Sequence, residues 1–473
     1  MKICLVNPPA FDDDAALVGE TKSIQRVMNV IPSLGLGYIA AVLLEHGYQV
    51  KIFDCSLGMT HQQLIAALKK EQPDVVGITG ATPMFVSMQQ LAVDVRKQIS
   101  NAVIVIGGTH LTAAAEPTMR LDCFDVGVIG EGEITFLELV RKIEQSGLED
   151  LSGVAGIIYK KNGALVRTAA RTPIQDLDNI PFPARQLQPP LSAYRPTPAS
   201  YKKLPLGVMM TSRGCPSRCT FCDRAIFGSS FRQRSADNVV GEIEELINKY
   251  GAREIRFFDD TFTLNESRVI EILDKMKERK IKIPWTCLTK VVNVSEELLR
   301  KMRAAGCWQV LFGFESGDER MLKLLKKGNT LEQNIRAIRL AKRVGLSIRG
   351  DFIVGTPGET VESLNRTLEF AIKHNLDYAH FNKFIPYPGT ELYRMLVGKG
   401  YVFDFTKKCS IIDHSALMYV PESMTKEQLK GFLDSANKRF YLRPGYILRR
   451  LVTIRSLDEF KGQLNGFYAI WNL

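Results

Sequence analysis

Cys215, Cys219 and Cys222 form the most chemically distinctive pattern in this chain, because their CxxxCxxC spacing brings three thiolates together in one short stretch. Iron–sulfur clusters are normally held by four Cys thiolates, so three without a fourth would leave one iron of a four-iron cluster open to an outside ligand. A structural zinc site is the alternative, but it would show a second Cys or His pair after a spacer. The next cysteines, Cys287 and Cys307, each stand alone in apolar segments. The pattern therefore predicts a catalytic 4Fe–4S cluster with Cys215, Cys219 and Cys222 as its metal ligands.

Carboxylates follow two apolar runs further along the chain. Asp259 and Asp260 come directly after the run at 255–258, and Glu315 follows the run at 310–312. Because parallel barrels keep their chemistry at the carboxyl ends of their strands, these groups are expected to accept hydrogen bonds from a ligand's ammonium or hydroxyl groups. Helix capping is the alternative, since Asp favours N-caps and helices are predicted to begin near residues 264 and 318.

Taken in order, these motifs resemble the radical S-adenosylmethionine superfamily over about residues 206–400. In that family the aromatic residue before the third cysteine contacts adenine, and a segment matching 257–262 holds the amino group of the methionine. Segments resembling 313–317 and 348–359 meet the ribose, the carboxylate and the adenine. The resemblance implies that S-adenosylmethionine is bound through Phe221, Asp259, Asp260, Gly313, Glu315, Ser316 and Gly355.

The first part of the chain predicts an α/β fold. Up to about residue 146, short β-branched runs alternate with helical stretches such as 34–46 and 84–99, which indicates a doubly wound parallel sheet. Its strands are expected at 2–6, 49–53, 74–79, 102–106 and 125–129. A hairpin turning through Asn162 and Gly163 and a Pro-rich linker are expected over 147–203.

The second part of the chain repeats the βα alternation. With 473 residues, the chain is long enough for two or three domains. Six βα units predict a partial (β/α)6 barrel of the TIM type over 204–400, followed by a mainly helical C-terminal cap over 401–473. Its strands are expected near 206–212, 254–258, 285–289, 308–314, 346–353 and 379–385.

Short motifs of the first domain resemble the cobalamin-binding domain that precedes the radical domain in one large subgroup. Their glycines would let the backbone approach a flat macrocycle closely, whereas an ordinary flavodoxin-like domain is the alternative. The resemblance implies cofactor contacts through Pro8, Gly107, Gly108, His110, Gly130, Glu131 and Gly132. None of the six histidines has an aspartate two residues before it, so no protein histidine is expected on cobalt. His110 is expected near the corrin or the substrate instead.

The combined resemblance implies a class B radical methylase. A radical made from S-adenosylmethionine would remove hydrogen from an unactivated carbon of a small-molecule, lipid or tetrapyrrole-type substrate, and methylcobalamin would supply the methyl group. The stretch 107–112 with Glu116 and Pro117 most resembles the anaerobic magnesium-protoporphyrin ester cyclase and hopanoid-modifying branch, so radical ring formation is the runner-up. A methylthiotransferase should also have three cluster cysteines in its first domain and a β-rich RNA-binding tail, whereas Cys4, Cys55 and Cys123 each lie on or beside a predicted strand and the tail is predicted to be helical. A corrinoid carrier would have no use for the cysteine triplet.

Composition indicates the surroundings in which the protein works. Nine cysteines, an odd number and mostly scattered, predict a reducing cytoplasm, and no apolar run approaches the length of a membrane span. The reductant is expected to be a flavodoxin or ferredoxin. The net charge of +11 is diffuse except at 438–455, so no nucleic-acid partner is expected. That segment predicts either a peripheral contact with anionic lipid or a solvated helix face.

Overall fold

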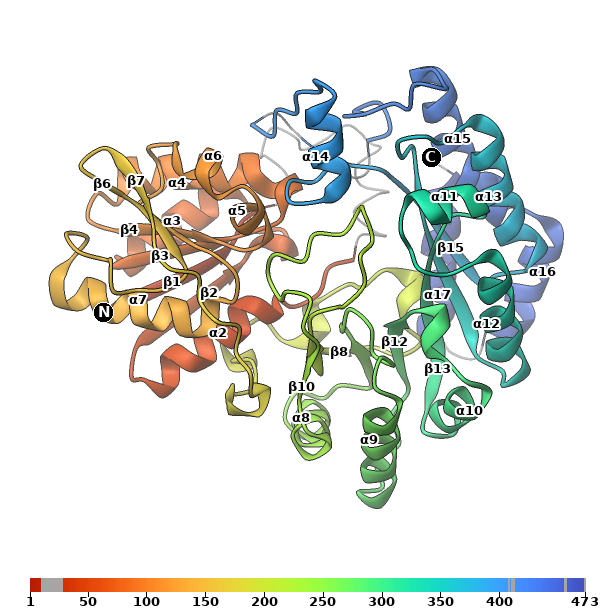
Figure 1. The fold of residues 1–473 in the computed structure, drawn as a ribbon. Coiled ribbons are helices and arrows are strands. Elements are labelled where there is room, and N and C mark those ends of the chain that lie inside the picture. Colours follow the sequence, from red (N-terminus) through yellow and green to blue (C-terminus); the bar gives the residue numbers. More distant parts are fainter. Residues whose placement is uncertain (10–28, 407–408, 410–412, 455–456, 472–473) are drawn as a thin grey trace.

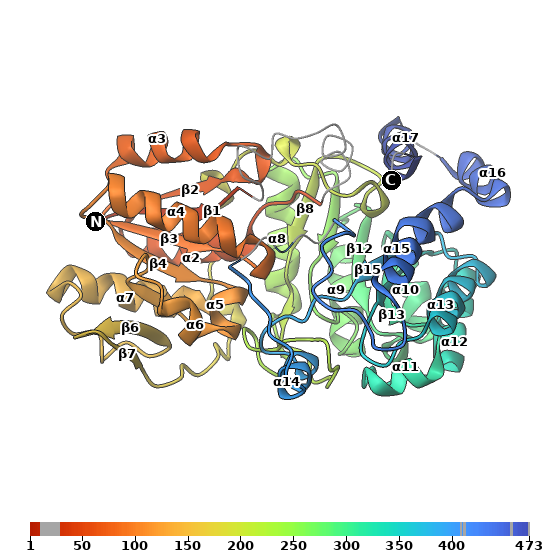
Figure 2. The same cartoon turned by 90° about the horizontal axis from the view of Figure 1, so that it is seen from above.

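The computed structural model describes residues 1–9, 29–406, 409, 413–454 and 457–471. Two sheets lie side by side, and the C-terminal helices lie on the side of the second sheet that faces away from the first (Figure 1 and Figure 2). The predicted fold class, a parallel α/β sheet followed by a partial barrel and a helical cap, is confirmed.

The first sheet has seven strands in the order β2-β1-β3-β4-β5-β6-β7. Its strands are β1 (Lys2–Asn7), β2 (Gln49–Asp54), β3 (Val75–Thr79), β4 (Val103–Gly107), β5 (Val126–Val128), β6 (Ile157–Lys161) and β7 (Ala164–Arg167). The five predicted strands are parallel, whereas the hairpin β6–β7 adds to β5 in the antiparallel sense. The hairpin lies within the segment 147–203 that is predicted to hold a hairpin and a linker, and it extends the first sheet. The exact domain boundaries stay a prediction.

Helices cover both faces of the first sheet. Side chains alternate along β1, so Ile3 and Leu5 point to one face while Cys4 and Val6 point to the other. Helices α2 (Leu34–Glu45) and α7 (Gly132–Ser146) pack on the first of these faces, and α3 (His61–Glu71) and α4 (Phe85–Gln98) pack on the second. The doubly wound arrangement therefore follows from strands that are apolar on both sides.

The second sheet is entirely parallel, in the order β15-β14-β13-β12-β11-β8. All six predicted strands are present: β8 (Leu206–Met209), β11 (Glu254–Phe257), β12 (Trp285–Thr289), β13 (Cys307–Glu315), β14 (Ser347–Val354) and β15 (Tyr378–Lys383). Its core is aromatic, with the rings of Phe257 and Phe262 stacked at 4.6 Å. The surrounding helices are α8 (Ala236–Asn248), α9 (Glu266–Glu278), α10 (Glu296–Ala304), α11 (Glu319–Leu324), α12 (Leu331–Arg343), α13 (Val361–Lys373) and α14 (Glu391–Gly398).

The C-terminal cap consists of α15 (Lys426–Tyr441), α16 (Pro444–Thr453) and α17 (Leu457–Trp471). In the basic segment predicted at 438–455, Arg450 is buried and donates to the hydroxyl of Tyr378, while Arg443 lies over the ring of Phe440 at 4.7 Å. The last basic residue of that segment, Arg455, lies outside the described residues. No described helix is both long enough and apolar enough to cross a bilayer.

Candidate active site

A cavity of about 860 Å³ lies between the carboxyl edges of the two sheets, and we refer to it as the first cavity. From the first sheet it is lined by residues at the ends of β1, β3, β4 and β5, and from the second sheet by residues at the ends of β12 to β15. Parallel sheets bind ligands at their carboxyl edges, so two such edges that face one space define one candidate site.

The predicted cluster cysteines lie on the loop between two short strands, β9 (Ser212–Arg213) and β10 (Arg232–Gln233). All three line the first cavity, with Cys215 and Cys219 half-buried and Cys222 exposed. Gly214 precedes them with φ +86°, and a side chain there would collide with the carbonyl oxygen of Ser230. Glycine is therefore required at the start of the loop.

The three thiols fit a cluster better than any other cysteines of the chain. The other six are buried elsewhere: Cys4, Cys55, Cys123, Cys287, Cys307 and Cys409. Among the described residues, no three His, Cys, Asp or Glu side chains lie close enough together to hold a single metal ion. A cluster does not need such a group, because each thiolate binds its own iron. Partial loss of hydration at the cavity wall raises the pKa of the Cys222 thiol to about 12, so metal loading must release its proton.

Two lysines, Lys290 and Lys327, lie beside the cysteine loop. The Lys290 Nζ donates to the Ser217 Oγ at 2.8 Å and to the carbonyl oxygen of Lys327 at 3.1 Å. Burial raises the pKa of Cys219, and the two ammonium groups act in the opposite direction by favouring the thiolate. Sequence reasoning missed both lysines. Lys290 directly follows β12, so the strand-end argument that selected Glu315 could have found it.

Glu315 lies at the end of strand β13, where the sequence predicts a strand end, and it lines the first cavity. Its Oε1 accepts a hydrogen bond from the Lys327 Nζ at 2.7 Å, and both side chains are buried. Its backbone has φ +65°, a left-handed conformation at the point where the strand register shifts against β14. A side chain at Gly313 would collide with Glu315 and would lie 2.9 Å from the Lys327 Nζ. Gly313 therefore leaves room for this ion pair.

Helix capping, the alternative role for the strand-end carboxylates, is wrong. The N-cap of α9 is Asn265, whose side chain accepts from the backbone of Arg268, and the N-cap of α11 is Asp318. Asp260 is exposed at the wall of the first cavity, and Phe221 lines the same wall. Both lie where a ligand can reach them, as predicted.

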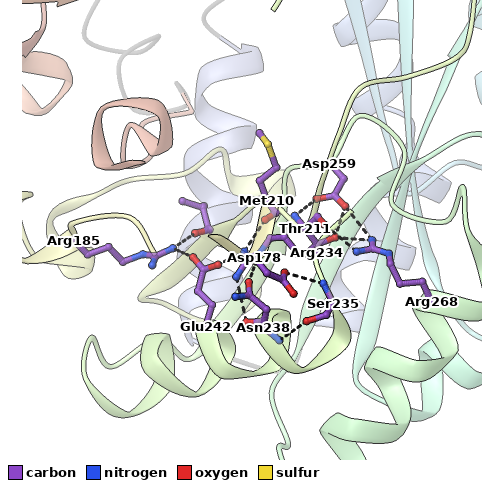
Figure 3. Close-up of polar contacts among 11 residues, drawn as sticks. Asp178, Arg185, Met210, Thr211, Arg234, Ser235, Asn238, Glu242, Asp259 and Arg268 are labelled. Atoms are coloured by element: carbon purple, nitrogen blue, oxygen red, sulfur yellow. Dashed lines mark hydrogen bonds and ion pairs between the residues drawn. The ribbon is translucent and has the colours of Figure 1, made fainter. Parts of the chain in front are cut away.

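Asp259 does not lie on the first cavity, contrary to the prediction that it binds a ligand. It accepts hydrogen bonds from the backbone N–H of Thr211 at 2.6 Å and from the Ser212 Oγ at 2.7 Å, and Arg268 lies 3.6 Å away. Figure 3 shows the contacts of Asp259 with Thr211 and Arg268, and the Asp259 side chain is buried. Of the two neighbouring aspartates, Asp260 is the one available to a ligand.

The same buried network anchors the strand that leads into the cysteine loop. Arg185 and Arg234 both form ion pairs with Glu242, which has no exposed surface (Figure 3). Their guanidinium groups also donate to the carbonyl oxygens of Val208 and Met210 at 3.0 and 2.8 Å. These contacts tie the end of β8 to α8, so the cysteine loop starts from a fixed point.

Two other predicted contacts lie off the first cavity. The Ser316 Oγ accepts from the backbone N–H of Asp318 at 3.1 Å, which supports the start of α11. The backbone N–H of Gly355 donates to the Oε2 of Glu359 at 2.6 Å. Burial raises the pKa of Glu359 to about 7. Ser316 and Gly355 therefore shape turns beside the site, and neither faces the first cavity.

Glycines form much of the first-sheet side of the first cavity. Gly107, Gly108, Gly130 and Gly132, which are predicted to contact the cofactor, all line the cavity. Gly108 has φ +91°, and a Cβ at this position would lie 2.6 Å from the Thr79 Oγ1. The backbone therefore carries no side chains at the positions where a large, flat ligand would have to come close to it.

Glu131 lines the first cavity, but its carboxylate joins the two domains. It accepts hydrogen bonds from Arg213 at 2.8 Å and from Arg232 at 2.9 Å, while Arg213 also donates to Glu133 at 2.6 Å. All four side chains are at most 7% exposed, and we refer to them as the domain clamp. Burial opposes the charge on Arg213, yet Glu133 and Glu131 raise its pKa above the ordinary value. Sequence reasoning missed Arg213, although it stands two residues before the first cysteine.

His110 and Pro8 were predicted to contact a ligand, but neither lines the first cavity. His110 lies in the short helix α5 (Thr109–Ala113), stacks on Phe85 at 4.0 Å and contacts the Thr82 Oγ1 at 3.2 Å. Burial lowers the pKa of His110 to about 4. The helix turns this side chain into the core. The neighbour of Pro8, Asn7, lines the cavity in its place.

Known protein families match both parts of the chain. Residues 209–371 match the model of the radical SAM superfamily, and residues 23–140 match that of the B12 binding domain. An uncharacterized methyltransferase of Pyrococcus horikoshii is 37% identical over 95% of this chain and 94% of its own. The chain belongs to the cobalamin-dependent radical S-adenosylmethionine family. Membership implies a 4Fe–4S cluster, S-adenosylmethionine and cobalamin, and it agrees with a methyltransferase activity.

Other members of this family are more distant. A cytidylyl-2-hydroxyethylphosphonate methyltransferase of Streptomyces wedmorensis is 28% identical and covers 90% of this chain and 91% of its own. An anaerobic magnesium-protoporphyrin IX monomethyl ester cyclase of Rubrivivax gelatinosus is 28% identical over 94% of this chain and 78% of its own. The structure of OxsB with aqua-cobalamin bound has a TM-score of 0.71 and 19% identity, and covers all of this chain and 72% of that one. This last likeness establishes a shared fold.

Proposed function

We propose that this radical S-adenosylmethionine enzyme transfers a methyl group to an unactivated carbon of a small-molecule, lipid or tetrapyrrole-type substrate. The first cavity carries the proposal, because the cysteine loop and the glycines of the first sheet line the same space. A methyl donor and a hydrogen-abstracting group must both reach one carbon, and reacting atoms must come within about 3–3.5 Å. One shared cavity meets this requirement.

When bound, the cluster with S-adenosylmethionine supplies hydrogen abstraction and cobalamin supplies methyl transfer, while the chain supplies binding and orientation. Cys215, Cys219 and Cys222 would hold the cluster. Asp260 would accept hydrogen bonds from the amino group of S-adenosylmethionine, and Lys290 would offer positive charge to its carboxylate, since Lys327 is already paired with Glu315. The domain clamp keeps the two sheets together and limits the entry of water between them.

Radical ring formation is the second candidate function, favoured by the likeness to the magnesium-protoporphyrin ester cyclases. A methylthiotransferase is disfavoured by the placement of the first-domain cysteines. Cys4, Cys55 and Cys123 are all buried, and none of them lines the first cavity. One cluster corresponds to about four irons per chain, whereas a methylthiotransferase would hold about eight.

The products of S-adenosylmethionine distinguish the candidates. Anaerobically reconstituted protein with cobalamin, reductant and substrate should release both 5′-deoxyadenosine and S-adenosylhomocysteine, since one molecule serves hydrogen abstraction and another remethylates the cofactor. A cyclase should release 5′-deoxyadenosine alone. Cys219→Ala should abolish 5′-deoxyadenosine in either case. Formation of neither product by the wild-type protein would contradict both assignments.

A further inference from the structure

A second cavity, of about 800 Å³, lies between the second sheet and the C-terminal helices α16 and α17. Much of its wall is apolar and comes from the two helices and the residue that follows α16, including Ile447, Leu451, Ile454, Phe460, Leu464 and Phe467. Leu451 and Leu464 are each 57% exposed, a large fraction for aliphatic residues that border a cavity. These side chains would lose water contact if an apolar ligand entered.

Arg256, on β11, is the unusual polar group of the second cavity. Its side chain is 8% exposed, and its Nη1 has no hydrogen-bond partner in the described part of the chain. No described carboxylate forms an ion pair with it, and its guanidinium lies over the ring of Phe258 at 4.7 Å. Burial, together with the nearby charge of Arg349, lowers the pKa of Arg256 to about 9. A buried charge without a partner costs folding free energy, which indicates that an anion outside the chain completes the site.

The other charged groups at this end of the barrel already have partners. Arg349 donates to both carboxylate oxygens of Asp351, at 3.0 and 3.2 Å, and to the Ser200 Oγ at 3.0 Å. His380 lies 3.6 Å from Asp351, and burial lowers its pKa to about 3, so its ring is neutral. One carboxylate therefore faces two guanidinium groups, and it is engaged with Arg349 rather than Arg256.

The second cavity meets the first inside the barrel. Asn382, near the end of β15, lines both cavities. On β14, Arg349 lines the second cavity and Asp351, two residues further along the same face, lines the first. A ligand held at Arg256 can thus extend along the inside of the sheet toward the cysteine loop.

We propose that the second cavity binds the substrate, and that the substrate is an elongated apolar molecule with a carboxylate or phosphate group. Arg256 is the counter-ion of that group, α16 and α17 cover the apolar body, and the far end passes Asn382 into the first cavity. The role as substrate rests on the proposed methyl transfer, whereas the binding of such molecules does not.

Binding to the full-length, cluster-reconstituted protein tests the proposal by calorimetry with four probes: dodecyl phosphate, dodecanoate, dodecanol and inorganic phosphate. The two anionic amphiphiles should bind more tightly than dodecanol and inorganic phosphate. Arg256→Gln should weaken dodecyl phosphate roughly ten- to a hundredfold, because a charge-assisted hydrogen bond to a desolvated anion is lost. The matched control is Arg253→Gln, at an exposed arginine directly before the same strand, and it should leave the affinity unchanged.

Thermal unfolding separates ligand binding from a structural role. Without ligand, Arg256→Gln should unfold at the same or a higher temperature than the wild type, because it removes an unpaired buried charge. A clear loss of thermal stability, equal affinity of the variant for dodecyl phosphate, or equally tight binding of dodecanol or inorganic phosphate would overturn the proposal.

The same probes separate this inference from the proposed function. The triple variant of Cys215, Cys219 and Cys222 to Ala should lose 5′-deoxyadenosine formation and still bind dodecyl phosphate. If the wild-type protein binds the probe through Arg256 but transfers no methyl group, the site stands and the methyl-transfer assignment fails. Methyl transfer without any Arg256-dependent binding overturns the site alone.

Discussion

The two sheets present contrasting edges to the first cavity. The edge of the first sheet is largely glycine backbone, and the two carboxylates that line the cavity there, Glu131 and Glu133, form ion pairs with arginines of the domain clamp. The edge of the second sheet carries thiols, lysines and the open carboxylate of Asp260. One edge therefore provides space and the other provides charge. Substitutions that add volume should harm the first edge, and substitutions that remove charge should harm the second.

The largest effect is expected at the cysteines of the second edge. Cys219→Ala should abolish the cluster, because the described chain offers no fourth thiol nearby to take its place. Iron and sulfide content after anaerobic reconstitution measures this. Cys287→Ala, at a fully buried cysteine of the core, is the control and should keep about four irons per chain. Retention of four irons in the Cys219 variant would refute the cluster assignment.

The domain clamp should give the next largest effect. Glu131→Gln would leave Arg213 and Arg232 buried with too little negative charge, which costs roughly 3–5 kcal/mol in the free energy of unfolding. Denaturant titration of the metal-free protein measures it. Glu138→Gln breaks a more exposed ion pair with Arg171 and should cost at most about 1 kcal/mol. Equal costs for the two variants would mean that the clamp does not hold the domains together.

The neighbouring aspartates should separate folding from binding. Asp260→Asn should weaken S-adenosylmethionine binding by about 1.5–3 kcal/mol, or roughly ten- to a hundredfold, with little change in stability. Asp259→Asn should instead destabilise the fold, because Arg268 and Thr211 lose a buried charged partner. Calorimetric titration and thermal unfolding of both variants measure the split. If Asp260→Asn lowered the unfolding temperature and Asp259→Asn weakened S-adenosylmethionine binding, Asp260 would have a structural role.

Asp259 and Asp260 also show which parts of the site the sequence could predict and which it could not. Both aspartates follow the same apolar run, so their order along the chain cannot tell which one faces the cavity. The strands themselves were predictable, because strands buried on both faces consist of continuous runs of β-branched and aromatic residues. The cysteine loop was predictable because its spacing is local.

The missed residues depend on tertiary structure. The clamp partners Arg213 and Glu131 are far apart in the sequence and meet only when the domains pack. The helix that starts at Thr109 turns His110 inward, and no local pattern indicated a helix that short. The second cavity requires strands and C-terminal helices that the chain brings together from a distance.

A smaller effect is expected where volume is added to the first edge. Gly108→Ala places a side chain at φ +91° and 2.6 Å from the Thr79 Oγ1, so it should cost about 1–3 kcal/mol of stability and weaken cobalamin retention. Gly35 lines the same cavity, and a Cβ added there would meet nothing within 4 Å, so Gly35→Ala should be tolerated. Unfolding temperature and bound cobalamin after gel filtration measure both. Equal tolerance would argue against close backbone approach.

Substitution of a histidine is expected to have the smallest effect on the cobalamin site. All six histidines lie in the described part of the chain, and none lines the first cavity. Electron paramagnetic resonance of the Co(II) form should therefore show no nitrogen superhyperfine splitting from an axial imidazole. The spectrum should not change in His110→Gln. A clear nitrogen triplet would contradict this placement.

The domain clamp has a consequence for how the cofactors arrive. Separating the sheets widely enough to admit a macrocycle would break the buried contacts of Arg213 and Arg232 together, since both share Glu131. Because it would leave buried charges unpaired, such an opening should be rare, and exchange of a bound corrinoid should be slow compared with catalytic turnover. The order of assembly then matters: a corrinoid present during folding is enclosed as the domains meet, whereas one added later must wait for the clamp to open.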